Sequence, residues 1–329
     1  EAGAEVRLQF AVEGLIEEGG RVVGVRGRTK DGREVVERAK IVVGADGRHS
    51  FVAKAVKAER YNERNHCTYD YYTFFSGVPR RGLELWIKGR LTGAAYDSNR
   101  GLTFVGCWGP RAWFHDFRAD LPTNFMRTIE ALSPDYAELL RQGKREERIY
   151  GTADQPNAYL KPWGPGWALV GDAGFMKDQC TAIGMTHAFR DSQLLTDALV
   201  EGLGGKRPLD DALADYHRRR DEDSAGYYDF VCGIAQMNMF SAQQLELFAA
   251  MRGNQRAIDA FLGAFGDVVP APEFFSDANL GAITSGADPA LPRPDVLVNY
   301  EARAAAALRC PYPKASGRPL AVATAGGVT

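Results

Sequence analysis

In the segment that starts at Trp167, one acidic residue stands where a carboxylate could meet a ligand. The apolar run Trp167 to Val170 predicts a short buried strand, which breaks at Gly171 and Asp172, and a helix is predicted to begin near Ala182. Ligands of open α/β sheets bind at the carboxyl ends of strands, and the first turn of a helix offers free N–H groups and about half a positive charge to an anion. The segment therefore predicts a site for an anionic, polyhydroxylated cofactor, for which a flavin is the obvious candidate.

Two runs in the sequence resemble motifs of one enzyme superfamily, the FAD-dependent oxidoreductases with the para-hydroxybenzoate hydroxylase fold. Its Gly-Asp motif is matched by Gly171, Asp172, Ala173, Gly184, Met185, Ala188 and Asp191. Its Asp-Gly motif is matched, within IVVGADGRHSFV at residues 41–52, by Gly44, Ala45, Asp46, Gly47 and Ser50. The order and separation of the two motifs match as well. The superfamily includes group A flavin monooxygenases, flavin halogenases and geranylgeranyl-reductase-like enzymes.

The resemblance implies an α/β (α+β) fold, with a partial GR2-type FAD/NAD(P)-binding Rossmann-like domain, an antiparallel-sheet substrate domain and C-terminal helices. We expect residues 1–58 to form the middle part of the FAD-binding domain, with a β-meander and the Asp-Gly motif, and residues 149–204 to return to that domain with the Gly-Asp motif and its helix. Residues 59–148 are expected to form the substrate-binding sheet, residues 205–283 a helical region and residues 284–329 a disordered tail.

The pattern of residues supports this division. Aromatic alternation from Tyr61 to Gly109 predicts several antiparallel strands, and spacing predicts helices over Thr123 to Gln142, Leu209 to Ala235 and Ala242 to Phe265. The first of these helices is interrupted, or restarts, at residues 133–134 (Ser-Pro). Near the start, residues 21–27 alternate as a strand and residues 30–32 predict a hairpin turn.

The opening unit of the superfamily, a strand, G-x-G-x-x-G and a helix, is not recognisable from Glu1 onward. We therefore expect the chain to begin inside the protein and to lack at least one βαβ unit, and Glu1 to Gly3 to be the end of a helix closed by a glycine. One alternative hypothesis follows directly, namely that the chain as it stands is a non-catalytic fragment without its dinucleotide-binding motif. The sequence upstream of Glu1 would distinguish a truncated enzyme sequence from such a fragment.

Four positions depart from the superfamily pattern. Ala53 stands in place of an arginine that helps to shape the face used by the nicotinamide cofactor, so the mode of reduction is left open. Phe175, Gln179 and Ile183 replace residues that are His, Pro and Gln in many members.

The resemblance implies roles for the matched residues, each with a plainer alternative. Asp172 is expected to accept a hydrogen bond from a ribityl hydroxyl of FAD, although an Asp after Gly also caps turns and helices. The N–H groups of Ile183, Gly184 and Met185 are expected to face the flavin pyrimidine edge, where preorganised dipoles stabilise the charge of the reduced ring. Gly184 would let the backbone approach the ring closely, or it is an ordinary loop glycine.

The second motif and the neighbouring charges allow similar pairs of interpretations. Asp46 and Gly47 are expected to support the FAD pyrophosphate region from behind, or to form an ordinary Asp-Gly turn. Asp191 either helps to organise the cofactor region or pairs with Arg190 or Arg218. Arg48 is a candidate surface charge, and a lone helical histidine such as His187 is usually a packing residue.

No residue is recognisable as a catalytic acid or base, which fits an enzyme whose cofactor carries the chemistry. The aromatic residues of the predicted sheet either line an apolar substrate pocket or form plain core: Tyr69, Tyr71, Tyr72, Phe74 and Trp108. The active-site lysine of flavin halogenases is not recognisable, and Lys88 is a poor match for it, so halogenation is not expected.

Composition favours a cytoplasmic enzyme. The 329 residues carry a formal net charge of −2, which gives no support to nucleic acid or an anionic membrane as a partner. No apolar run approaches the roughly 20 residues of a membrane span. The five cysteines form no metal-binding spacing and are odd in number, so a reducing compartment is the simplest interpretation, and no metal is expected.

These observations predict an FAD-dependent oxidoreductase, a monooxygenase that takes electrons from NAD(P)H and hydroxylates or epoxidises a small organic molecule. The alternative is a flavin-dependent reductase of carbon double bonds, as in the geranylgeranyl-reductase-like branch, because the two classes share every motif quoted above. The substrate, the choice of NADH or NADPH and the oligomeric state are left open by the sequence.

Overall fold

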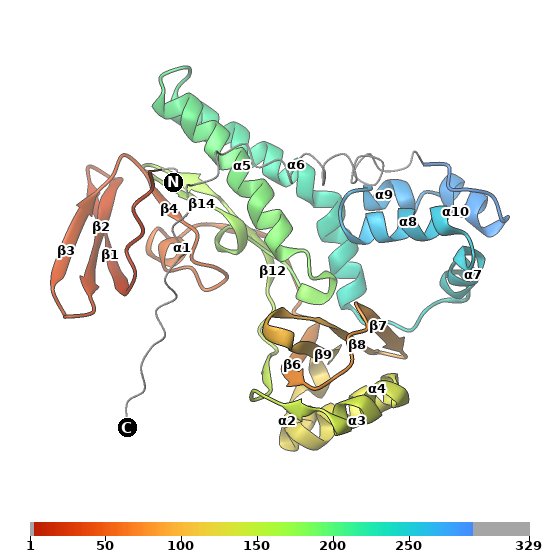
Figure 1. Cartoon of the computed structure of the whole chain (residues 1–329). Coiled ribbons are helices and arrows are strands. Elements are labelled where there is room, and N and C mark those ends of the chain that lie inside the picture. Colours follow the sequence, from red (N-terminus) through yellow and green to blue (C-terminus); the bar gives the residue numbers. More distant parts are fainter. Residues whose placement is uncertain (1–2, 292–329) are drawn as a thin grey trace, which may run out of the picture.

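The computed structural model describes residues 3–291, and the strands of this range form four sheets. Figure 1 shows a small meander at one end, two long helices beside the central strands, and a larger sheet packed on its own helices. This mixture of helices and sheets confirms the predicted α/β (α+β) class. Glu1 and Ala2 of the predicted helix end, and residues 292–329 of the predicted tail, lie outside the described residues.

The chain opens with an antiparallel meander of β1 (Phe10–Glu18), β2 (Arg21–Thr29) and β3 (Glu34–Arg38). The β1–β2 connection is Gly19-Gly20, and both glycines have positive φ, +57° and +76°, as a tight hairpin turn of this hand requires. The second turn, where Gly32 has φ +84°, joins β2 to its antiparallel neighbour β3, so the strand at residues 21–27 and the hairpin turn at residues 30–32 are confirmed.

Two strands from distant parts of the sequence pair in parallel beside this meander. β4 (Val42–Gly44) lies against β14 (Trp167–Leu169), with Trp167 opposite Val42 and Leu169 opposite Gly44. Because parallel strands end at the same edge, the loops after β4 and β14 emerge together. β13 (Trp163–Gly164) continues this sheet, and the short helix α1 (Phe51–Ala55) follows β4.

A third small sheet lies next in space and has the order β15-β12-β5. Its strands are β15 (Phe175–Met176), β12 (Asn157–Leu160) and β5 (Arg60–Arg64), and both pairings are antiparallel. In the sequence, β12 precedes β14 and β15 follows it. This sheet therefore connects the central strands with the larger sheet.

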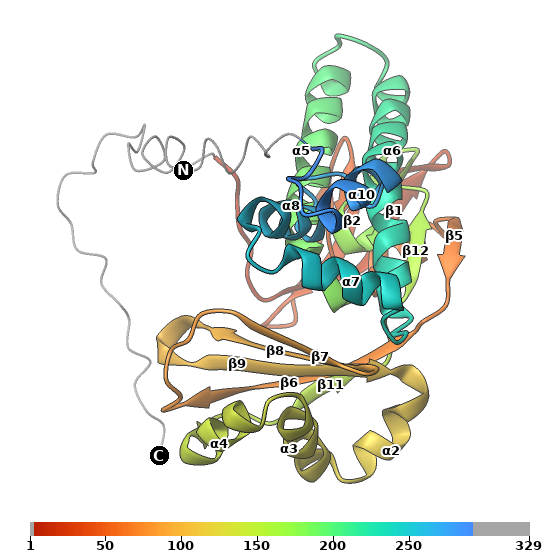
Figure 2. The same ribbon diagram turned by 90° about the vertical axis from the view of Figure 1, so that its right-hand side faces the viewer.

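The larger sheet is antiparallel and six-stranded, with the order β10-β6-β9-β8-β7 and β11 also paired with β6. Its strands are β6 (Thr68–Ser76), β7 (Glu84–Lys88), β8 (Leu91–Asp97), β9 (Thr103–Pro110), β10 (Lys144–Arg145) and β11 (Tyr150–Thr152). The helices α2 (Phe114–Ala119), α3 (Leu121–Leu132) and α4 (Pro134–Gln142) cover one face (Figure 2). The predicted interruption at Ser133 and Pro134 is confirmed, because α3 ends and α4 begins there.

The period of two along β6 decides which side chains form this core. Tyr69, Tyr71 and Phe75 are buried in one apolar cluster with residues of the covering helices, including Phe117 and Ile129. The two tyrosines therefore belong to the core of this sheet. Tyr72, Phe74 and Trp108 are half-buried on the strands, and Tyr72 stacks on Phe104 and Tyr150.

The longest helices, α5 (Gly184–Leu203) and α6 (Leu209–Ala235), pack against each other through an apolar cluster. The bounds of α6 are those expected from spacing. α5 begins two residues later than predicted because Ala182 has φ +56°, a left-handed conformation that a helix cannot contain.

The C-terminal part of the described chain consists of short helices. They are α7 (Ala242–Met251), α8 (Gln255–Phe265), α9 (Ala271–Phe274) and α10 (Asp277–Thr284). The segment from Ala242 to Phe265 is helical as predicted, but it is divided into two helices, because the chain turns at Gly253, whose φ is +82°, and Asn254 then caps α8. The 3-10 turns of the fold are η1 (Asn99–Gly101), η2 (Arg111–Trp113), η3 (Gly171–Ala173) and η4 (Gln179–Thr181).

Candidate functional site

A pocket of about 500 Å³ opens where the parallel strands β4 and β14 end. Five of the residues singled out in the sequence line it together: Gly47, Gly171, Asp172, Gly184 and Met185. Three do not, namely Asp46, Ala173 and Ile183, although each adjoins a lining residue. The two sequence motifs therefore meet in space at one cavity, at the edge of the sheet where ligands of α/β proteins bind.

The turn η3 presents Asp172 to this pocket. Gly171 has φ +58°, and a Cβ there would lie 3.0 Å from the Cβ of Ala188 on α5, so both conformation and space call for glycine. Ala173, by contrast, is buried in the apolar cluster that contains Leu169. Gly171 and Ala173 are buried, and Asp172 between them is exposed to the pocket.

The Asp172 carboxylate makes no hydrogen bond or ion pair within residues 3–291, and it caps neither η3 nor α5. Although it is open to the pocket, protein on its other sides excludes water, and this desolvation raises its pKa, while Lys177 and Arg48 act in the opposite direction. Both cations line the same pocket. The carboxylate is thus held near positive charge but left without a hydrogen-bond donor.

The N-terminus of α5 opens into the same pocket. Ile183 is the N-cap residue and offers no side-chain hydrogen bond, and the first amide satisfied by the helix there is that of His187, which donates to the Ile183 carbonyl at 3.2 Å. A Cβ at Gly184 would meet no atom within 4 Å. The first turn of a 20-residue helix therefore presents uncapped N–H groups to a cavity, an arrangement suited to an anion.

The Asp46 carboxylate, unlike that of Asp172, is hydrogen-bonded within its own loop. It accepts hydrogen bonds from the N–H groups of Phe51 at 2.7 Å and Val52 at 3.2 Å, at the start of α1. Asp46 thus shapes the loop, while Gly47, with φ +75°, and Arg48 reach the pocket.

The arginine that the superfamily resemblance leads one to expect at position 53 would not fit this fold. Ala53 is only 6% exposed and lies in the apolar cluster with Val52 and Leu169. A guanidinium there would be buried without a partner, so the substitution Ala53→Arg is expected to destabilise α1.

Several charged side chains lie at or near the pocket, some of them on α5. Lys177 lies with its ammonium 4.4 Å from the ring centre of Phe175, and burial lowers its pKa to about 8. Asp191 is fully buried, and its nearest cation is Arg190, at 3.7 Å. The predicted pairing with Arg190 is confirmed in preference to Arg218, which pairs with Asp215 and Glu222.

His187 is a packing residue, as expected for a lone helical histidine. It is 2% exposed, its ring stacks on Phe175, and Nε2 lies 2.8 Å from a carboxylate oxygen of Asp267. Burial lowers its pKa to about 4, so the ring is neutral at neutral pH.

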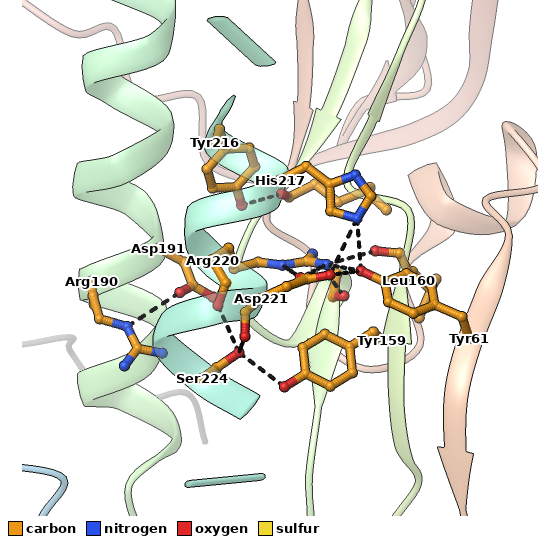
Figure 3. A network of polar contacts seen from close by, with 12 residues as sticks. Tyr61, Tyr159, Leu160, Arg190, Asp191, Tyr216, His217, Arg220, Asp221 and Ser224 are labelled. Atoms are coloured by element: carbon orange, nitrogen blue, oxygen red, sulfur yellow. Dashed lines mark hydrogen bonds and ion pairs between the residues drawn. The ribbon is translucent and has the colours of Figure 1, made fainter. Parts of the chain in front are cut away.

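A buried arginine that sequence reasoning missed holds the turn of Asp172 in place (Figure 3). Arg220 of α6 is 1% exposed and donates to the carbonyls of Gly174 and Leu160, both at 3.1 Å, and to the hydroxyl of Tyr61 at 2.7 Å. Tyr216, one turn earlier, donates to the carbonyl of Leu169 at 2.8 Å. The end of β14 and the residue after η3 are therefore both fixed by α6.

One signal for this support was present in the sequence. Tyr216, Arg220 and Ser224 follow each other at intervals of four, so they share one helix face. A polar stripe of this kind within an otherwise apolar face indicates buried polar partners, because buried polar groups are hydrogen-bonded.

Two buried carboxylates join the pocket to the six-stranded sheet. Asp70 of β6 is 3% exposed and accepts from Nε2 of Gln155 at 3.1 Å, and burial raises its pKa to about 6. Asp178 accepts from the hydroxyl of Thr68 at 2.6 Å. Since Gln155 and Asp178 line the pocket, the sheet is hydrogen-bonded to the pocket wall. In the sequence, the one sign that Asp70 has a buried role is that it is a single acidic residue within a predicted strand of aromatic residues.

Within residues 3–291, no cluster of His, Cys, Asp or Glu has the form of a metal site. None of the helices in that range combines the length and hydropathy needed to cross a bilayer.

Comparisons with known proteins agree on one superfamily. Residues 140–267 match the family model of squalene epoxidase. The chain is 26% identical over 211 residues to digeranylgeranylglycerophospholipid reductase of Methanocella arvoryzae, covering 59% of this chain and 48% of the relative. It is 29% identical over 216 residues to 6-methylpretetramide 4-monooxygenase of Streptomyces rimosus, covering 64% and 51%. The chain thus spans about half the length of these curated relatives.

Solved structures of flavoenzymes share the fold. The flavin-dependent brominase Bmp2 superposes with a TM-score of 0.66 at 17% identity, over 92% of this chain and 72% of that one. The myxobacterial chondrochloren halogenase CndH, an FAD-dependent enzyme, superposes with a TM-score of 0.63 at 21% identity, over 77% and 61%. At these identities the likenesses show a shared fold, and together with the family-model match and the curated relatives they support a superfamily of FAD-dependent monooxygenases and oxidoreductases.

Proposed function

We propose that this protein is an FAD-dependent monooxygenase that uses NAD(P)H and acts on a small organic substrate. FAD, when bound, supplies the redox chemistry by accepting a hydride from NAD(P)H and passing electrons to dioxygen. The observation that carries the proposal is the pocket into which an unpaired carboxylate, Asp172, and an uncapped helix N-terminus both open.

The lining of the pocket fits a flavin cofactor. Asp172 would accept a hydrogen bond from a ribityl hydroxyl, and the N–H groups of Ile183, Gly184 and Met185 would face the edge of the ring that becomes negative on reduction. A Cβ at Gly47 would meet no atom within 4 Å, so this part of the wall is open backbone. Arg48 and Lys177 would supply positive charge for a phosphate-bearing ligand.

The remaining motif residues would act through the backbone. Gly171 and Ala173 set the turn that aims Asp172, and Asp46 holds the loop from which Gly47 would support the pyrophosphate region. We also propose that the segments expected from the sequence are the functional division of the chain, with residues 1–58 and 149–204 binding FAD and residues 59–148 facing the substrate.

The first test is the substitution Asp172→Ala in protein expressed from the start codon of its gene and loaded with FAD. Loss of a hydrogen bond to a carboxylate is expected to weaken FAD binding roughly tenfold to a hundredfold. The matched control is Asp223→Ala, which removes an exposed carboxylate of α6 that lies outside the pocket. Equal flavin content in the parent and in Asp172→Ala would contradict the assignment.

A second candidate function is a flavin-dependent reductase of carbon double bonds, and it is favoured by the likeness to reductases such as the Methanocella arvoryzae enzyme. Oxygen uptake coupled to NAD(P)H oxidation separates the two. A monooxygenase consumes about one dioxygen for each NAD(P)H in the presence of substrate, whereas a reductase oxidises its donor under anaerobic conditions when given an alkene.

We further propose a cytoplasmic location. The four cysteines within residues 3–291, Cys67, Cys107, Cys180 and Cys232, are all free thiols, as is usual in a reducing compartment.

A further inference from the structure

A second cavity, of about 570 Å³, lies on the face of the six-stranded sheet opposite to α2, α3 and α4. It is enclosed by β7 and the start of β8, by the last turns of α6, and by α7 and α8. Figure 2 shows α7 and α8 on this side of the sheet. Its volume lies within the range of pockets that bind small organic ligands.

The lining of this cavity is almost entirely apolar. Six phenylalanines contribute to it: Phe230, Phe240, Phe248, Phe261, Phe265 and Phe275. From the sheet side come Leu85 and Ile87 of β7, which remain 51% and 48% exposed although both are large aliphatic residues. A concave apolar surface of this kind marks a ligand or partner site.

Charge separates this cavity from the pocket of Asp172. Arg48 and Lys177 line the Asp172 pocket, whereas no Lys, Arg or His lines the apolar cavity among the described residues. Its one ionisable acid, Asp229, is paired with Arg64 at 3.1 Å. An anionic ligand would lose its hydration here without meeting a cation, so the cavity favours uncharged molecules.

The two cavities lie on either side of one short segment, η4. Gln179 lines the Asp172 pocket and Cys180, the next residue, lines the apolar cavity. The segment is held by residues of the Asp172 pocket, because the Cys180 N–H donates to Asp178 at 3.1 Å and the Gln179 N–H donates to Gln155 at 3.3 Å. A molecule in the apolar cavity would therefore be one layer of backbone away from the proposed flavin pocket.

We propose that the apolar cavity binds the substrate, and that the substrate is an uncharged molecule with a mainly hydrocarbon or aromatic body. This proposal rests on the proposed flavin chemistry at the Asp172 pocket for its catalytic meaning. Cations line one pocket and phenylalanines line the other. The first therefore suits a phosphate-bearing cofactor, and the second suits an apolar reactant.

Gly233 offers a direct way to fill the cavity. It lies in α6, lines the cavity, and a Cβ there would meet no atom within 4 Å. The variant Gly233→Phe would thus begin its side chain in open space at the wall of the cavity and reduce the volume left for a ligand. Gly281→Phe is the matched control, because Gly281 is also helical, also has no atom within 4 Å of a Cβ, and lies outside the cavity lining.

Binding is measured on the FAD-loaded protein with N-phenyl-1-naphthylamine, an uncharged fluorescent probe, and with dodecanol and dodecanoate as competitors. We expect Gly233→Phe to weaken probe binding about tenfold or more, with Gly281→Phe like the parent, and dodecanol to displace the probe at concentrations about tenfold below those of dodecanoate. Equal probe affinity in the two variants, or equal competition by alcohol and carboxylate, would overturn the proposal.

Flavin content and the visible flavin spectrum, recorded in the same samples, separate this proposal from the proposed function. Retained FAD with a spectrum that shifts on addition of dodecanol in the parent, but not in Gly233→Phe, is the expected result. Probe binding by protein that retains no FAD would remove the proposed function and with it the role of the cavity in catalysis. Probe affinity that falls as protein concentration rises would show that a second copy of the chain covers the cavity, and would also overturn the proposal.

Discussion

Asp46 and Asp172 occupy similar places in the fold and play different parts. Each follows closely on one of two paired parallel strands, β4 and β14, and each stands next to a glycine with positive φ. The Asp46 carboxylate is satisfied within its own loop by the N–H groups of Phe51 and Val52, whereas Asp172 meets no donor within the described residues. A carboxylate whose loop supplies donors acts as a cap, and one whose loop supplies none is available to a ligand.

The two loops also differ in what supports them. The loop of Asp46 holds itself through local bonds, such as the Ala53 N–H to the Ser50 hydroxyl at 2.9 Å. The turn of Asp172 is held from outside by Arg220 and Tyr216 of α6. A site that leaves its own carboxylate unpaired thus draws its rigidity from a neighbouring helix. Three experiments can break or sharpen this comparison.

The largest effect is expected from Arg220→Met, which removes the outside support. The carbonyls of Gly174 and Leu160 would lose a buried donor, and we expect the free energy of unfolding to fall by about 3 kcal/mol in urea denaturation. The exposed neighbour Arg219→Met is the control and should stay within about 0.5 kcal/mol of the parent.

Hydrogen exchange shows whether the loss in Arg220→Met is local. The Gly174 amide, which closes η3 by donating to the Gly171 carbonyl at 2.9 Å, should exchange faster, while the Ala53 amide near Asp46 should change little relative to global stability. Equal acceleration at both amides would mean that the two loops do not differ in their support.

A smaller effect is expected from Lys177→Met, which removes a cation beside Asp172. The pKa of Lys177 in the folded protein, about 8, lies below the ordinary lysine value of 10.5, so the unfolded chain binds the proton more tightly. Stability is therefore reduced below about pH 8 and recovers as the pH rises toward 10.5. The variant should be more stable than the parent at pH 7, by on the order of 1 kcal/mol, and the difference should shrink by pH 10.

Lys161→Met is the matched control for that experiment. Lys161 also lies over an aromatic ring, that of Trp163 at 5.5 Å, but it is exposed, so Lys161→Met should stay within about 0.5 kcal/mol of the parent. A Lys177→Met difference that stays constant from pH 7 to 10 would mean that the ammonium is not desolvated in the folded protein.

The smallest effect tests the two aspartates directly. Asp46→Ala should lower the free energy of unfolding by about 1 kcal/mol, because two N–H groups at the start of α1 would lose their acceptor, and it should weaken FAD binding less than Asp172→Ala does. Asp172→Ala should do the reverse, with stability within about 0.5 kcal/mol of the parent and weaker FAD binding. Thermal unfolding with and without FAD measures both, and a stability loss of the same size in the two variants would erase the distinction.

Much of the local structure could be predicted because neighbouring residues decide it. The hairpin at Gly19-Gly20 and the break at Ser133-Pro134 follow from the φ values that glycine and proline allow. The start of α5 was misplaced by two residues, since nothing local announces that Ala182 is left-handed. The helix expected from Ala242 to Phe265 divides at Gly253 because the two halves pack separately into the C-terminal cluster.

The sequence by itself determined that a strand, a break with one aspartate, and a helix follow each other, since these depend on apolar runs and on residues a few positions apart. Only the tertiary structure decided that Asp172 is free while Asp46 is bonded, that Arg220 reaches Gly174, and that an apolar cavity lies beyond η4. Those features arise from contacts between segments far apart in the chain, and the order of residues does not show which segments meet.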